Sequence, residues 1–127
     1  MYNPFNRAEE SAIMRYVFSI IDADLSIHQS EEAFLNLLGM KFGFTQQDLM
    51  KAVIMEEQIA NRTLSLMSSE KKQLTSALFT AAAMADGNRR LAKAEMDKCF
   101  SILKECSLPL NVSFSDSLRI AHEFVDR

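Results

Sequence analysis

The sequence is poor in the residues that break regular structure. It has only three glycines, two prolines, two cysteines and no tryptophan among 127 residues. So few glycines and prolines favour helices over a sheet with many turns. Cys99 and Cys106 lie seven residues apart in a predicted helix, a rise of about 10.5 Å. That exceeds the roughly 7 Å limit for the Cα atoms of a disulfide, so we expect two reduced thiols in the core.

Long runs of charge or of apolar residues are also missing. The formal net charge is -3, and no long basic run is present, which argues against a nucleic-acid-binding protein. The longest apolar run, Ala81–Ala85, is far too short to cross a bilayer, so we expect no integral membrane segment. The N-terminus lacks an apolar stretch of signal-peptide length. We therefore expect a cytoplasmic protein.

What the sequence does contain is apolar spacing typical of helices. We predict one all-α domain over residues 1–127, with about seven helices and no strand. The Asn3–Pro4 pair is expected to cap the first helix, Gly43 to end the second, and Thr45–Asp48 to open the third as a capping box. The residues at 113–116 repeat that pattern before the last helix. The expected helices cover about 8–23, 28–42, 46–54, 57–66, 69–85, 93–106 and 113–124.

Two halves of the chain align with each other. Residues 17–24 match residues 79–86 at an offset of 62, and the helix that follows matches at an offset of 64. We therefore predict two pseudo-symmetric helix–loop–helix repeats, at about 8–55 and 69–126, packed into one compact bundle. The apolar positions expected to face the core at matching places are Val17 and Phe79, Ile20 and Ala82, Leu35 and Cys99, Leu38 and Ile102, and Phe42 and Cys106.

Four acidic residues prolong these apolar stripes. Asp24 and Asp86 end the first helix of each repeat, while Glu31 and Glu95 open the second. Burying an unpaired charge is costly, so each carboxylate should be paired, capped or coordinated. One interpretation is structural, with the four groups capping helix ends and turns. The other is a Ca²⁺ or Mg²⁺ site held by oxygens of one or both loops. Further candidate ligands are Asp22, His28 and Asn88.

These residues make the chain resemble the TerB-like domains of the tellurite resistance protein B family. The similarity lies in Ala85-Asp86-Gly87 with Leu91 and Glu95, and again in Ala23-Asp24 with Ile27 and Glu31. It covers about residues 10–125. The resemblance implies a fold of about seven helices, a cytoplasmic stress-linked role, and metal binding by the matched residues Asp24, Glu31, Asp86 and Glu95. Leu25 replaces the family's glycine in the first repeat.

Enzymatic chemistry has little support in the sequence, because no phosphate-binding loop, nucleophile elbow or paired histidine motif is present. We therefore expect a non-enzymatic domain that binds an unidentified protein partner, with a divalent cation as a possible cofactor. The alternatives are a metal-dependent hydrolase that uses the same four carboxylates and a purely structural helical module. Among the eight methionines, Met50 and Met55 are the candidates for an adaptable binding surface, although core packing is the commoner use.

Overall fold

The computed structural model confirms the all-helical fold, and it describes residues 3–22, 29–84, 92–110 and 114–125. At 29–31, 92–95 and 114 it describes the backbone alone. The described residues form seven helices and no strand. The predicted cap at 113–116 lies partly outside these residues. The helices are α1 (Arg7–Ile21), α2 (Gln29–Lys41), α3 (Gln46–Val53), α4 (Glu57–Ser65), α5 (Ser69–Ala83), α6 (Ala92–Glu105) and α7 (Phe114–Val125).

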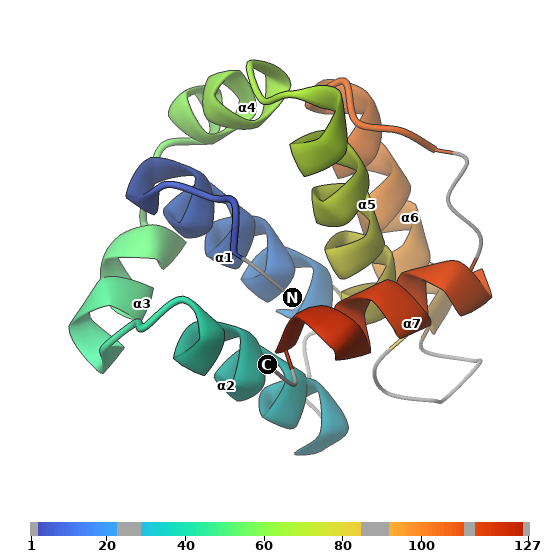
Figure 1. Cartoon of the computed structure of the whole chain (residues 1–127), viewed down its shortest axis with the longest axis horizontal. Helices are drawn as coiled ribbons and strands as arrows, with labels where there is room; N and C mark the ends of the chain where they lie inside the picture. Colours follow the sequence, from blue (N-terminus) through green and yellow to red (C-terminus); the bar gives the residue numbers. More distant parts are fainter. Residues whose placement is uncertain (1–2, 23–28, 85–91, 111–113, 126–127) are drawn as a thin grey trace.

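Helices α1 and α5 occupy the centre of the bundle (Figure 1). The first packs against α2, α3, α4, α5 and α6, and the second packs against α1, α2, α6 and α7. Nine consecutive residues of α5, from Thr75 to Ala83, are buried, because small side chains there let neighbouring helices approach on all sides. No helix among the described residues is long and apolar enough to cross a membrane.

The bounds of the helices follow the offsets that align the two halves. Helices α1 and α5 both contain 15 residues, and each bound of the second lies 62 positions after that of the first (69 − 7 and 83 − 21). All ten predicted core positions are buried, with Leu35 the most exposed at 7%. The predicted assignment of these stripes to the core is therefore confirmed.

Helices α2 and α6 end in the same way, 64 positions apart. After α2, Gly43 N–H donates to Met40 O at 3.1 Å and Phe44 N–H donates to Gly39 O at 2.8 Å. These two bonds, with Gly43 at φ 68°, form a Schellman motif. The same two bonds follow α6, and there the left-handed residue is Ser107, at φ 56°. This shared ending fixes the register in which α2 and α6 correspond.

One predicted helix start is wrong, and one is confirmed. Asn6, and not Asn3, caps α1, because Asn6 and Glu9 form a reciprocal capping box. Asn3 Oδ1 instead accepts a hydrogen bond from Phe5 N–H, in the segment that precedes the helix. At α3 the predicted capping box between Thr45 and Asp48 is present.

Candidate functional site

The four predicted metal ligands lie only partly within the described chain. Asp24 and Asp86 fall outside it. Glu31 is in the first turn of α2 and Glu95 is in the first turn of α6, and only their backbone is described. Among the residues whose side chains the structure describes, no group of three or more His, Cys, Asp or Glu could hold a metal ion. The metal site therefore stays a prediction.

Helices α1 and α5 run side by side in the same direction. Near their first turns, Glu9 Oε1 accepts from Lys71 Nζ at 2.9 Å. Two turns further along both helices, the Tyr16 and Phe79 rings lie 6.0 Å apart, edge to face. The last residues of the two helices, Ile21 and Ala83, therefore lie at the same end of the bundle. The segments that carry the predicted ligands Asp24 and Asp86 follow α1 and α5, which both end at this end of the bundle.

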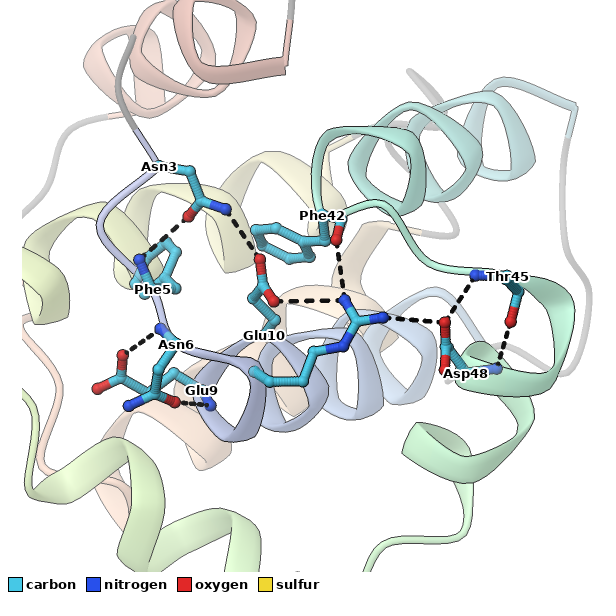
Figure 2. Close-up of polar contacts among 9 residues, drawn as sticks. Asn3, Phe5, Asn6, Glu9, Glu10, Phe42, Thr45 and Asp48 are labelled. Atoms are coloured by element: carbon cyan, nitrogen blue, oxygen red, sulfur yellow. Dashed lines mark hydrogen bonds and ion pairs between the residues drawn. The ribbon is translucent and has the colours of Figure 1, made fainter.

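Two buried carboxylates of α1 belong to a polar network at its first turn, shown in Figure 2. Glu9 and Glu10 are each 7% exposed, yet both are paired. Glu9 accepts from Asn6 N–H at 2.9 Å as well as from Lys71. Glu10 accepts from Asn3 Nδ2 at 2.8 Å and from Arg7 at 3.4 Å. Because charged hydrogen bonds offset the cost of burial, these carboxylates are parts of the scaffold.

Arg7 extends this network to α2 and α3. Its guanidinium donates to Phe42 O at 2.9 Å, at the end of α2, and to Asp48 Oδ2 at 2.9 Å, in the first turn of α3. The same group lies 4.4 Å from the centre of the Phe44 ring. Hydrogen bonds from Thr45 and the charge of Arg7 hold the pKa of Asp48 below its usual value. Arg7 thereby fixes the corner at which α2 and α3 meet.

Two buried thiols and a buried phenol lie away from solvent. Tyr16 Oη and Cys106 Sγ both donate to Asn61 Oδ1, which joins α1, α4 and the end of α6. Burial raises the pKa of Cys106 to about 11 and that of Cys99 to about 12, and it raises the pKa of Tyr16 as well. At neutral pH both cysteines are therefore protonated, and neither has the lowered pKa of an activated nucleophile.

Two apolar grooves border helix α2. The α2–α3 groove has a volume of about 510 Å³ and lies at the corner that Arg7 fixes. None of the described residues that line it carries a carboxylate, ammonium or guanidinium group. They are Met14, Leu35, Asn36, Gly39, Met40, Phe44, Thr45, Gln46 and Leu49.

The α2–α7 groove lies on another side of the same helix and has a volume of about 240 Å³. Among the lining residues that the structure describes, His122 is the only ionisable one. The groove is lined by Ala33, Phe34 and Leu37 of α2, by Ala81 and Met84 at the end of α5, and by Leu118, Ala121, His122 and Val125 of α7.

Helix α2 presents apolar side chains to solvent between these grooves. Met40 is 76% exposed and borders the α2–α3 groove, while Leu37 is 42% exposed and borders the α2–α7 groove. The corresponding positions of α6, 64 residues later, are Lys104 and Ser101, and both are exposed. The fold therefore accepts polar residues at these positions, and α2 differs from its counterpart by an apolar ridge. We call Leu37, Met40 and the two grooves the α2 surface.

This surface was not predicted from the sequence. The predicted candidates were Met50 and Met55, of which Met50 is 64% exposed and Met55 packs against the core. The signal that could have found the α2 surface was present in the aligned repeats. Leu37 and Met40 fall outside the buried stripe of α2, and the second repeat has Ser101 and Lys104 there.

Comparisons with known proteins identify a relative of the fold alone. No family model and no curated protein matches the chain. The chain is similar in structure to a crystallised protein of unknown function from Porphyromonas gingivalis, with a TM-score of 0.75 and 20% sequence identity. The match covers 96% of this chain and 99% of the other. At this identity the similarity extends to the all-helical fold and carries no activity with it.

Proposed function

We propose that this chain is a non-enzymatic, TerB-like domain of the cytoplasm that binds a partner protein through the α2 surface. The observation that carries the proposal is the exposure of Leu37 and Met40 between two grooves whose described lining residues include no carboxylate, ammonium or guanidinium group. The TerB-like assignment and a stress-linked role rest on the resemblance of the two Ala-Asp segments, at residues 23–24 and 85–86, to that family.

A protein partner accounts for this exposure in physical terms. Apolar surface costs about 25 cal/mol for each Å² left in water, so a ridge of two such side chains is retained at a cost unless something covers it. Exposed apolar residues that adjoin hollows are typical of sites where proteins bind. Ser101 and Lys104 in α6 support the proposal, because they mark the ridge as dispensable for folding.

Photocrosslinking in the cells that make this protein tests the proposal. A photoreactive phenylalanine analogue replaces Met40 in one variant and Lys104, its counterpart on α6, in another. After irradiation, the first variant should give discrete adducts with another protein, and the second should not. Equal adducts from both positions, or none from either, would contradict protein binding through the α2 surface.

The cation remains part of this proposal as a second, separate element. Asp24, Glu31, Asp86 and Glu95 would hold Ca²⁺ or Mg²⁺ through oxygen ligands, and this would stabilise the ends of the two repeats. The parallel course of α1 and α5 supports it, because both helices end at one end of the bundle.

Melting curves with either ion at millimolar concentration, or with a chelator, test the cation. A bound ion should raise the melting temperature of the native chain by a few degrees and leave that of an Asp24→Asn/Asp86→Asn variant unchanged. The cation is ruled out if neither calorimetric heat nor a shift in melting temperature is seen for the native chain.

A further inference from the structure

We propose that the α2 surface receives one amphipathic helix of the partner, which lies across α2 and places an uncharged apolar side chain in each groove. This inference rests on the proposed function and adds the chemistry and secondary structure of the segment that binds. The α2 surface is then a helix-binding site, in which apolar anchors at helical spacing supply the affinity.

The lining of the grooves determines the chemistry of the anchors. A charged side chain placed in either groove would lose its water without meeting a carboxylate, ammonium or guanidinium group among the lining residues that the structure describes, where His122 is the one ionisable residue. The polar lining atoms belong to neutral groups such as those of Asn36, Thr45 and Gln46. Phosphorylated or acidic segments are therefore disfavoured, and large aliphatic or aromatic anchors are favoured.

The arrangement of the grooves determines the spacing of the anchors. Met40 stands on the ridge, and at about 100° per residue the two sets of α2 residues that line the grooves fall on either side of it. Crossing one helix means spanning about 10 Å. Residues i and i+7 of a partner helix are separated by about 10.5 Å, which matches this span. Residue i+3 or i+4 of the partner then covers Met40.

The size of the ridge argues against a second copy of this chain as the occupant. A stable dimer buries about 800 Å² on each subunit. Leu37 is 42% exposed and Met40 is 76% exposed, and together they supply on the order of 100 Å² of apolar surface. A single helix with two or three anchors matches this area better than a whole domain does.

Peptide display on the immobilised full chain tests this inference. Random 16-residue peptides are selected, and the enriched ones are synthesised and titrated by fluorescence anisotropy. They should carry large uncharged apolar residues at i and i+7, with another at i+3 or i+4, and should gain helical circular dichroism on binding. The same peptides are titrated against three variants of the chain.

All three variants take residues that the opposite repeat already has. L37S/M40K gives α2 the residues of α6 and should weaken binding at least tenfold, and M40K alone should weaken it at least threefold. F100N gives α6 the residue found at position 36 of α2, removes a side chain that is 39% exposed, and should leave binding within twofold. Because M40K changes only a mostly exposed residue, it remains informative if the double variant is poorly folded.

Four results would overturn the inference. These are no enrichment, enriched peptides with charged anchors or the alternating pattern of a strand, equal affinity for M40K and the native chain, and dimerisation of the native chain that M40K abolishes. The last result would identify a second copy as the occupant. If the photocrosslinks form at position 40 while the helical consensus is absent, protein binding stands and the helical occupant is wrong.

Discussion

Replacement of Asn61 by alanine should destabilise the fold by more than the value of one hydrogen bond. Asn61 Oδ1 accepts from both the Tyr16 hydroxyl and the Cys106 thiol, the latter at 3.3 Å. Tyr16 is 1% exposed and Cys106 is fully buried, so in the native fold neither donor is in contact with water. The Tyr16 hydroxyl is the stronger donor, and without Asn61 it keeps only the weakly accepting sulfur of Cys106 as a partner, so it sets the cost.

The magnitude follows from the asymmetry between losing a bond and leaving a donor unpaired. A typical hydrogen bond contributes about 1 kcal/mol, and a buried group without a partner costs about 1–3 kcal/mol. We therefore expect Asn61→Ala to lower the free energy of unfolding by about 2–3 kcal/mol. Tyr16→Phe removes the donor with its bond and should cost about 1 kcal/mol. In the double variant no hydroxyl is left unpaired. Its loss of stability should therefore be about 1 kcal/mol smaller than the sum of the losses in the two single variants.

Urea denaturation followed by circular dichroism measures these three free energies of unfolding. Arg62→Ala, on the exposed side of the same helix, is the control and should change the free energy by less than about 0.5 kcal/mol. Strict additivity of Tyr16→Phe and Asn61→Ala would refute the reasoning. A loss below about 1 kcal/mol for Asn61→Ala would also refute it, because the hydroxyl would then have found another partner.

Three further predictions concern stability. Ser107→Gly should raise the free energy of unfolding by about 1 kcal/mol, and Gly43→Ser should lower it similarly, because both residues have left-handed backbone. A loss of stability for Ser107→Gly, or a gain for Gly43→Ser, in urea titrations would contradict this. Ser117 has a buried hydroxyl without a partner in the described chain, so Ser117→Ala should be stabilising by about 1 kcal/mol, and a comparable loss would count against it. The pKa values of Cys99 and Cys106, about 12 and 11, lie above the 9.0 of a free thiol. The unfolded chain therefore loses these protons first, and the stability that is present below pH 9 should fall as the pH rises toward 11. Cys99→Ala should flatten that loss in urea titrations at pH 8 and pH 10, and an equal slope would argue against thiol burial as the cause.

The arrangement of helices could be predicted from the sequence because apolar spacing and backbone breaks act locally. The predicted ends of α5, at about 69 and 85, lie within two residues of the observed ends. The capping box at Thr45 was also predictable, because its two partners are three residues apart. The prediction of Asn3 as the cap was wrong, because a stronger signal, the Asn6-x-x-Glu9 capping-box pattern, lies three residues later.

The binding surface could not be predicted in the same way. Spacing indicates which side of α2 is buried, but exposure depends on which helices pack beside it. Met50 and Met55 look alike in the sequence, yet one is exposed and the other packs against the core. For Met40, the neighbours that form the groove come from α1 and α3, and no local pattern in α2 reports them. The two aligned repeats supply the missing comparison, because Lys104 marks the same position as open to solvent.

The most direct test of protein binding at α2 is the rate at which Met40 is oxidised by hydrogen peroxide. In this reaction the thioether gains one oxygen and the peroxide leaves as water. Met40 and Met50 are 76% and 64% exposed, and only Met40 lines a groove beside α2. In the purified chain both should oxidise at similar rates, as measured by mass spectrometry. In intact cells of the native host, the partner should slow the oxidation of Met40 at least fivefold relative to Met50. Equal rates at the two residues in cells would contradict binding at the α2 surface.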